Sequence, residues 1–529
     1  MSQYDVIIIG GGVSGVYSAW RLLSEKKAKK VAIFEADNHI GGRLLSVTPP
    51  NIPFMTAELG GMRILPAVQP RIQKLIDALN KDTTHPDDYI ETFPFPVDQP
   101  NNISYLRGTY LRLSDFQSDP DKVPYRLTFQ EFGKTAGQLV INAIEQVIPG
   151  ITNKNRTEQE RREMAHQAKF DGLPLYRQGF WQVLMRVMSG EAYQLAKAAG
   201  GYQTTINNWN AADAIPWFLS DFGVAPEYHG FKEGFQQIPL TLAERVKELG
   251  GEIFLNSRVI GFDQKERQIE INLHDGTVHR AGALILAMPR RSLDLLSPGS
   301  PLLCQPHVKR LISSVTPRPL FKLFTTYMEP WWIPAGVTEG RSTTDLPIRQ
   351  TYYWPKVDGE APTSGRAMLM ASYDDGLNVG FWDGFRLKHG IFWEDEVQAI
   401  VDKPDDTFWF EGTVAETGDS YPKWHQYRAP EEMVEEIQRQ LADVHGLKHV
   451  PSVIDASYKD WGDDPFGGGW NAWNIGVKSW EVKREIINPD PDAPVYICGE
   501  AYSDAQGWVE GALQTADMML EQYFDVTNL

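Results

Sequence analysis

Three things are scarce or missing in this sequence of 529 residues: cysteine, excess positive charge and long apolar runs. Its two cysteines, Cys304 and Cys498, exclude the disulfide framework of a small secreted domain, so a reducing compartment, the cytoplasm, is the simplest expectation. The balance of 51 Lys and Arg against 69 Asp and Glu, a net charge of −18, makes nucleic acids and anionic membranes poor partners.

We also expect no signal that directs the chain to or across a membrane. The uncharged stretch over residues 6–20 is rich in glycine and shorter than the ~20 apolar residues of a membrane helix. The N-terminus lacks the basic start and the cleavage site of a secretory signal. With 42% apolar residues, the composition indicates instead a folded, acidic chain. At ~150 residues per domain, its length suggests two to four domains.

The first 35 residues carry the pattern of a βαβ unit. An apolar strand over residues 4–9 is followed by a glycine turn, a helix over 16–24 and a second strand that ends at Glu35. The turn reads Gly10-x-Gly12-x-x-Gly15. In this context the glycines let a pyrophosphate approach helix N–H groups, and the acid accepts hydrogen bonds from ribose hydroxyls. We therefore predict a dinucleotide-binding site.

Helical patterns dominate residues 126–230. Thr128 and Glu131 fit a capping box, and apolar residues then recur at helical spacing until Pro149. This region is expected to form a helical subdomain.

Strand patterns return after the helical region, at residues 251–262, 268–273 and 278–287. The last two are joined by a turn at residues 274–277, which predicts a hairpin. Further helices are expected from Pro430, with a stop at Gly446, and over about 508–523. Strands and helices that alternate in this way favour an α/β fold.

A second glycine motif, Gly41-Gly42-Arg43, begins six residues after Glu35 and resembles the flavin-dependent amine oxidase superfamily. In that family the motif lies against the FAD pyrophosphate. The C-terminal runs at residues 497–501 and 507–512 also resemble the family, in which this strand, turn and helix return to the flavin. The resemblance implies non-covalent FAD, because Cys498 lies in the strand and position 503 is Ser.

The resemblance also implies how the chain divides into domains. Its segments would form a discontinuous, Rossmann-like FAD-binding domain (1–66, 231–318 and 451–529), a mixed-sheet substrate-binding domain (67–125 and 319–450) and the helical subdomain (126–230). The residues expected to bind the cofactor are Gly10, Gly12, Val13, Ser14, Gly15, Glu35, Ala36, Gly41, Gly42, Arg43, Gly60, Gly61, Met62, Arg63, Val259, Gly499, Glu500, Gly507, Trp508 and Val509. For Val259, a plain buried strand valine is the alternative.

The run Glu58-Leu59-Gly60-Gly61-Met62-Arg63 resembles the L-amino acid oxidases, in which this arginine pairs with the α-carboxylate of the substrate. A guanidinium fork fits a carboxylate bidentately, and an amine without a carboxylate would leave the buried cation unpaired. Alternatively, Arg63 caps the next loop or pairs with a protein acid. Tyr373 matches a family tyrosine that donates to the same carboxylate, although packing alone is the alternative for a strand tyrosine.

Lys322 matches a family lysine that holds a water near flavin N5 and helps O2 react with the reduced flavin. An isolated charge within an apolar run needs a reason, although an edge-strand lysine that points to solvent is the alternative. The resemblance thus implies Lys322, Arg63 and Tyr373 as the catalytic set.

The expected walls of the substrate pocket are aromatic. Trp470 and Trp508 would suit large side chains or stack on a cation, the carbonyl of Gly507 would lie near the substrate amine, and Trp217 would line the entrance. Asp375 falls where other members carry an apolar pocket residue. If it pointed inward it would favour Lys or Arg as substrate, although a loop aspartate beside Gly376 is the alternative we favour.

The resemblance implies oxidative deamination of L-amino acids to 2-oxo acids, with O2 as acceptor and release of ammonia and H2O2. A flavin-dependent L-amino acid monooxygenase, an amine or polyamine oxidase and a flavoprotein without activity are the alternatives. Homodimers are common among the relatives, so we expect one. No metal is expected, because Gly446 interrupts the helix between His445 and His449 and no third ligand follows.

Overall fold

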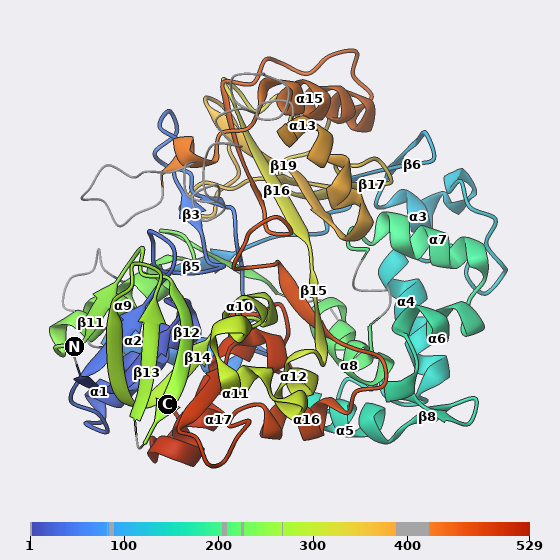
Figure 1. The fold of residues 1–529 in the computed structure, drawn as a ribbon. Coiled ribbons are helices and arrows are strands. Elements are labelled where there is room, and N and C mark those ends of the chain that lie inside the picture. The colour runs from blue at the N-terminus through green and yellow to red at the C-terminus, as the bar shows by residue number, and fades with distance from the viewer. Residues whose placement is uncertain are drawn as a thin grey trace.

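The protein is described by a computed structural model that covers residues 3–81, 83, 89–203, 209–223, 227–266, 268–387 and 423–529. Two large sheets stand one above the other in Figure 1, and a group of helices lies beside them. The C-terminal end of the chain lies beside the turn that follows the first helix, because Lys27 pairs with Asp525 at 2.7 Å. No helix in the described part of the chain is long and apolar enough to cross a membrane.

The first sheet contains the N-terminal strand and has strands from three distant segments. Its order is β11-β2-β1-β14-β13-β12, and β22 pairs with β14. The bounds are β1 (Gln3–Ile9), β2 (Val31–Phe34), β11 (Glu252–Phe254), β12 (Val259–Lys265), β13 (Gln268–Leu273), β14 (Val278–Ala287) and β22 (Val495–Cys498). β1 is parallel to both β2 and β14, as expected of a βαβ unit.

Helices from both ends of the chain cover this sheet. α1 (Val13–Ser24) packs against α9 (Gln237–Glu248) and against the C-terminal α17 (Val509–Phe524). The contact between α1 and α17 includes a hydrogen bond from the Tyr17 hydroxyl to Asp517, at 2.7 Å. The N-terminal nucleotide motif and the last helix thus share one hydrophobic core.

The second sheet is mixed. Its order is β20-β16-β19-β18-β17-β6-β7, in which β17 and β6 are parallel and the other neighbours are antiparallel. The bounds are β6 (Ile103–Leu106), β7 (Thr109–Arg112), β16 (Leu320–Tyr327), β17 (Gly340–Thr344), β18 (Gln350–Tyr353), β19 (Ala367–Asp375) and β20 (Asp455–Asp460). α15 (Glu431–His445) packs on this sheet and ends at Gly446, whose φ of 64° is left-handed, as a C-terminal glycine predicts.

The helices at the right of Figure 1 lie within the region in which helical patterns dominate the sequence. They are α4 (Ala136–Val147), α5 (Glu158–Gln167), α6 (Phe180–Val187), α7 (Gly190–Ala199) and α8 (Ala211–Phe222). The first of them begins later than predicted. Glu131 does accept a hydrogen bond from the Thr128 N–H, but that segment is a turn, and α4 is capped instead by Thr135 and Gln138. Both residue pairs satisfy the capping-box pattern, so the sequence alone could not separate them.

Shorter elements connect these parts. The remaining α-helices in the described ranges are α2 (Pro70–Lys81), α3 (Asp115–Ser118), α10 (Arg290–Leu296), α11 (Pro301–Cys304), α12 (Pro306–Ile312), α13 (Asp383–Leu387) and α16 (Ser479–Glu485). The part of the chain that the structure describes also holds four two-stranded pairs: β3 (Ser46–Val47) with β4 (Ala57–Glu58), β5 (Thr92–Pro94) with β10 (His229–Phe231), β8 (Lys169–Phe170) with β9 (Leu173–Pro174), and β15 (Val315–Arg318) with β21 (Trp470–Trp473).

The strand expected over residues 251–262 is in fact two strands. β11 pairs with β2 and β12 pairs with β13, so the chain must change direction between them. Asn256 adopts a left-handed φ of 51° in this bend, a conformation that asparagine tolerates better than most residues. The predicted hairpin of β13 and β14 is confirmed. The boundaries of the three domains stay a prediction.

Candidate active site

A cavity of about 380 Å³ runs along the edge of the first sheet and reaches the second sheet and α8. Residues from distant parts of the sequence line it. Among those selected from the sequence, the following line the cavity: Gly10, Gly12, Val13, Ser14, Glu35, Ala36, Gly41, Gly42, Arg43, Gly60, Gly61, Met62, Arg63, Trp217, Val259, Lys322, Tyr373, Trp470, Gly499, Glu500, Gly507, Trp508 and Val509. Two selected residues, Gly15 and Asp375, are not part of the lining.

The glycine turn opens one end of α1 toward this cavity. Gly12 is the N-cap, no side chain caps the helix, and the first turn carries no acid, so its N–H groups are available to an anion. A Cβ on Gly12 would meet nothing within 4 Å, which leaves room for a group to approach the backbone. Gly15 serves packing instead, because a Cβ there would lie 2.0 Å from the carbonyl oxygen of Gly10.

Glu35 lies at the end of β2 with its carboxylate beside the same turn. Its oxygens accept hydrogen bonds from the N–H groups of Gly11 at 2.6 Å and Asp37 at 2.9 Å. Burial raises the pKa of the carboxyl group, against the effect of these two hydrogen bonds. A carboxylate offers about four acceptor positions, so Glu35 retains capacity for the hydroxyls of a ribose.

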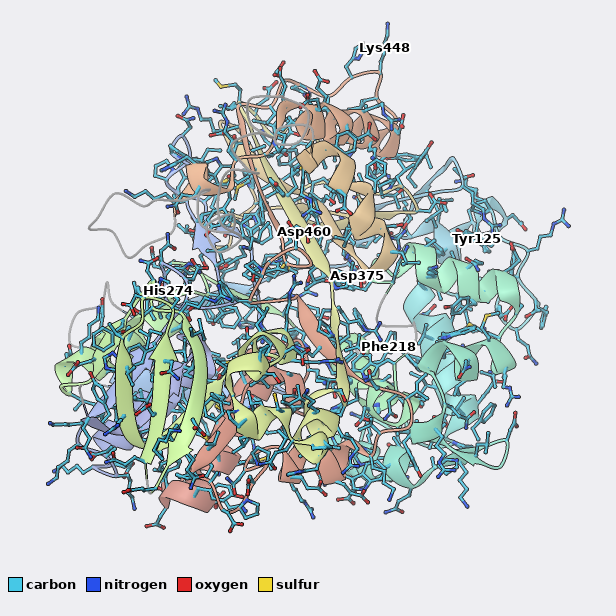
Figure 2. The ribbon with its side chains drawn as sticks, in the orientation of Figure 1. Tyr125, Phe218, His274, Asp375, Lys448 and Asp460 are labelled. Carbon is cyan, nitrogen blue, oxygen red and sulfur yellow. The ribbon has the colours of Figure 1, made fainter. Side chains whose placement is uncertain are left out.

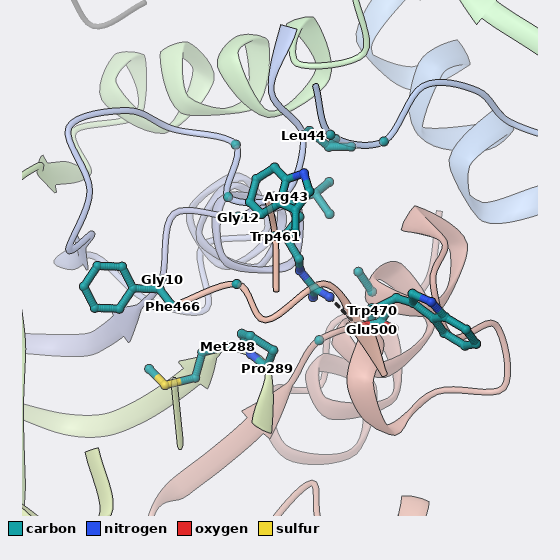
Figure 3. Close-up of a pocket in the computed structure, with 18 of the residues that line it drawn as sticks. Gly10, Gly12, Arg43, Leu44, Met288, Pro289, Trp461, Phe466, Trp470 and Glu500 are labelled. Carbon is teal, nitrogen blue, oxygen red and sulfur yellow. Dashed lines mark hydrogen bonds and ion pairs between the residues drawn. The ribbon is translucent and has the colours of Figure 1, made fainter. Parts of the chain in front are cut away.

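Arg43 and Glu500 join the N-terminal and C-terminal thirds of the chain at this cavity (Figure 3). The guanidinium donates to Glu500 at 2.7 Å and to the carbonyl of Gly469 at 2.8 Å. Glu500 also accepts from the backbone and side chain of Asn471 and from the N–H of Gly507. These four bonds fill the acceptor positions of the carboxylate. Glu500 therefore positions Arg43 and Gly507 and has no lone pair left for a further donor.

The lining fits a flavin dinucleotide. It combines N–H groups at the start of α1, an acid for ribose hydroxyls, and apolar side chains such as Met288 and Pro289, which Figure 3 labels among the lining residues. The thiol of Cys498 is buried and is not part of the lining, and burial raises its pKa to about 12. A buried, protonated thiol outside the cavity cannot attach the flavin, which agrees with non-covalent binding.

Arg63 brings a buried positive charge to the other end of the cavity. Its guanidinium stacks on the ring of Tyr228, 3.8 Å from the centroid, and donates to the hydroxyl of Tyr352 at 3.3 Å. Burial opposes the charge, but Tyr352 and other neighbours outweigh it and hold the pKa of Arg63 above its ordinary value. Among the residues that the structure describes, no carboxylate oxygen lies within 4.0 Å of the guanidinium. Its fork is thus open to a carboxylate from outside the protein.

Lys322 lies in the interior and not at a sheet edge. β16 pairs with β19 on one side and β20 on the other, and the side chain is 2% exposed. The ammonium donates to the carbonyls of Glu58 and Gly60, which belong to the segment that carries Arg63. Burial lowers the pKa of Lys322 to about 7, although the carboxylate of Glu58 opposes the shift. The alternative of a solvent-facing lysine is therefore wrong.

Tyr373 stands opposite Lys322 in the pairing of β19 with β16, and the ammonium lies 4.8 Å from the centre of its ring. Other aromatic side chains enclose the same end of the cavity. Trp217 and Trp470 are stacked, with centroids 5.9 Å apart and planes 13° apart, and the Trp217 indole donates to the carbonyl of Gln506 at 2.7 Å. Tyr202 meets Tyr373 edge to face, with centroids 5.2 Å apart.

Asp375 does not join this group and requires a correction. It is the last residue of β19, is 1% exposed, and accepts a hydrogen bond from the N–H of Gln203 at 2.7 Å. Figure 2 labels it where the end of β19 pairs with the start of β16. Since the strand ends here and a 3-10 helix begins at Gly376, the carboxylate is held by backbone and does not line the pocket.

Sequence reasoning missed several lining residues, of which Asp221 is the most informative. It lies on α8, one helical turn after Trp217, and is 5% exposed. Residues four apart on a helix share a face, so the prediction that Trp217 lines the site also indicates Asp221. Other missed lining residues include Tyr202, Phe222, Phe235, Trp461, Asp464 and Phe466.

The fold and the cavity define a flavin-dependent oxidoreductase, and comparison with known proteins agrees. The family model described as flavin containing amine oxidoreductase matches residues 13–382 and 410–518. The chain therefore belongs to this family, and its cofactor is FAD.

The relatives are distant but span most of the chain. Aplysianin-A of Aplysia kurodai is 26% identical over 98% of this chain and 90% of its own length, and achacin of Lissachatina fulica is 24% identical over 98% and 93%. An L-amino-acid oxidase of Sistrurus catenatus edwardsii is 24% identical over 72% of this chain and 68% of its own. A solved structure of a putrescine oxidase variant aligns with a TM-score of 0.65 at 16% identity, over 98% of this chain and 100% of the other, which shows a shared fold.

Proposed function

We propose that this flavin oxidoreductase is an L-amino acid oxidase, which converts L-amino acids and O2 to 2-oxo acids, ammonia and H2O2. The observation that carries the proposal is Arg63, a buried guanidinium that lines the cavity with no carboxylate within 4.0 Å among the described residues. A buried cation without a counter-ion is costly, and the carboxylate of an amino acid would supply one. Relatives that bear the name L-amino-acid oxidase support the same assignment.

Positioning of the substrate is the main contribution of the protein. Bound FAD would accept the hydride equivalent from the substrate and return the electrons to O2. Arg63 would hold the α-carboxylate through two parallel hydrogen bonds, and the Tyr373 hydroxyl would donate a third. A carboxylate fixed at these points restricts the orientation of the adjacent Cα–H bond, which lowers the entropic part of the barrier. The tryptophan pair Trp217 and Trp470 would exclude water from the side chain.

The amine must lose a proton before it can be oxidised. No carboxylate or imidazole needs to act as a dedicated base, because solvent can take this proton. A water held by Lys322 can also take it, since the pKa of about 7 leaves the lysine partly neutral near neutral pH. Lys322 would also place positive charge where O2 is reduced.

Replacement of Arg63 by Ala tests the assignment. We expect kcat/KM for an aromatic L-amino acid to fall, because a charged hydrogen-bond partner of the carboxylate is lost. The fall should correspond to a loss of roughly 2–4 kcal/mol of transition-state binding free energy. The decarboxylated amine serves as the control substrate, and its kcat/KM should rise or stay the same in the Ala variant. Unchanged amino acid kinetics in the Ala variant would rule the assignment out.

An amine oxidase is the second candidate, and one longer-range electrostatic interaction favours it. The carboxylate of Asp221 attracts the guanidinium and helps to raise the pKa of Arg63. Because Asp221 thus balances part of the charge of Arg63, a substrate without a carboxylate could also bind in the cavity. Turnover of the decarboxylated amine in preference to the amino acid would support this candidate. A 2-oxo acid product, as opposed to an amide, would separate an oxidase from an L-amino acid monooxygenase. The homodimer and the cytoplasmic location stay predictions.

A further inference from the structure

The substrate end of the cavity holds two buried charges of opposite sign. Arg63 and Asp221 both line it and are each 5% exposed. Asp221 comes from α8, and the Trp217 side chain one turn earlier lines the same space. A carboxylate with this degree of burial requires compensation by hydrogen bonds or by a cation.

The structure gives Asp221 little direct compensation. The hydroxyl of Tyr228 donates to one of its carboxylate oxygens at 2.8 Å, and in the described ranges no Lys, Arg or His nitrogen lies within 4.0 Å of it. Arg63 attracts it from a longer distance, but desolvation outweighs this attraction and raises the pKa of the Asp221 carboxyl group. Arg341 also attracts it, but that guanidinium is already paired with Asp98 at 3.1 Å.

A bound substrate changes this balance of charge. Once the α-carboxylate occupies Arg63, the attraction of that guanidinium for Asp221 is offset by a second negative charge nearby. A substrate with an apolar side chain then leaves Asp221 buried beside a carboxylate, whereas a substrate with a cationic side chain supplies the missing positive charge. The aromatic faces of Trp217, Trp470 and Tyr202 suit such a cation as well.

We propose that Asp221 binds the charged end of the substrate side chain, so that the preferred substrates are L-amino acids that end in an ammonium or a guanidinium group. The inference rests on the proposed L-amino acid oxidase function and adds a substrate class to it. The α-ammonium group is a poor occupant of this position, because its pairing with Asp221 would hold the proton that must leave before oxidation.

Substitution of Asp221 by Asn tests the proposal with matched substrates. L-Lysine and L-norleucine have similar side-chain lengths and differ in the terminal charge. We expect the wild-type chain to prefer lysine in kcat/KM by about tenfold or more, and the Asn variant to lose this preference while it retains activity on norleucine. Asp375→Asn is the control, because it removes a buried charge outside the cavity and should leave the preference unchanged.

Binding of non-oxidisable ligands gives a second readout. 6-Aminohexanoate and hexanoate both carry a carboxylate for Arg63 and lack an α-amine, and only the first ends in an ammonium group. Calorimetry should show about tenfold or more tighter binding of 6-aminohexanoate to the wild type and equal binding to the Asn variant. Equal Kd values for the two ligands in the wild type would overturn the proposal.

The outcomes separate this inference from the function on which it rests. Oxidation of norleucine without any preference for lysine, or an equal loss on both amino acids in the Asn variant, overturns the role of Asp221 alone. Oxidation of cadaverine in preference to lysine overturns the amino acid oxidase assignment, because cadaverine lacks the carboxylate, while a dependence on Asp221 would still support the cation site.

Discussion

Lys322 combines a positive charge with complete burial, and its surroundings determine its protonation state. Its ammonium is held by two backbone carbonyls of the segment Glu58–Gly60, the Glu58 carboxylate attracts it, and Arg63 repels it. Desolvation outweighs the attraction and brings the pKa to about 7. A lysine in this range changes charge under ordinary assay conditions, whereas a surface lysine does not.

The rate of flavin reoxidation should follow the charge of Lys322. Because the pKa is lowered, the ammonium form predominates below about pH 7 and is lost as the pH rises. A positive charge favours electron transfer to O2, so the reoxidation rate constant should fall as the pH rises through about 7. Stopped-flow mixing of reduced enzyme with O2 measures it. In Lys322→Met the rate should be lower and independent of this titration, while reduction by substrate changes less. A wild-type rate in the Met variant would contradict this role.

At the scale of elements, the turn between β1 and α1 separates two kinds of glycine. Gly12 borders the cavity with open space around its Cβ position, and Gly15 packs against the backbone of Gly10. One position serves the ligand and the other serves the packing of helix on strand, although both belong to the same motif.

Alanine at these two positions should have different effects. Gly15→Ala places a methyl group against the Gly10 carbonyl and should destabilise the flavin-free protein by roughly 1–3 kcal/mol, as overpacking does. Gly12→Ala should leave the melting temperature of the flavin-free protein unchanged and weaken FAD binding, because its methyl group occupies the approach to the N–H groups of α1. Thermal unfolding and flavin fluorescence titration measure the two effects. Equal loss of stability in both variants would refute the distinction.

Short sequence motifs correctly predicted several elements of the fold. The βαβ unit, the β13–β14 hairpin and the end of α15 at Gly446 follow from motifs a few residues long. The start of α4 and the break before β12 could not be chosen from such signals, because two capping boxes compete and the bend at Asn256 depends on pairing with distant strands. The orientation of Asp375 could not be predicted from local patterns either, because its carboxylate accepts a hydrogen bond from Gln203, which is distant in the sequence.

At the scale of the whole molecule, one cavity draws its walls from the beginning, middle and end of the chain. Gly12, Val259 and Gly499 all line it, from β-α and strand-end segments that are distant in sequence. A ligand that fills this cavity touches each of them, so its binding free energy stabilises the assembled chain and no single segment.

FAD should therefore raise the temperature of unfolding of the chain as a unit. At a free concentration of about 100 times its Kd, the cofactor would add about 2.7 kcal/mol to the free energy of unfolding. Calorimetry of the protein after removal and readdition of FAD measures this shift. An FAD-independent transition that carries most of the heat would show instead that the segments unfold separately.

The contact of α1 with α17 also has a consequence for synthesis of the protein. Tyr17 donates to Asp517 across 500 positions in sequence, so the face of α1 that packs on α17 waits for nearly the whole chain, whereas α9 is made earlier. At translation rates of ~5–20 residues per second, this interval lasts roughly half a minute or longer. During this interval, the part of α1 that will contact α17 lacks that partner. Nascent chains of this protein are thus expected to depend on chaperones for longer than those of a protein whose nucleotide-binding domain is continuous.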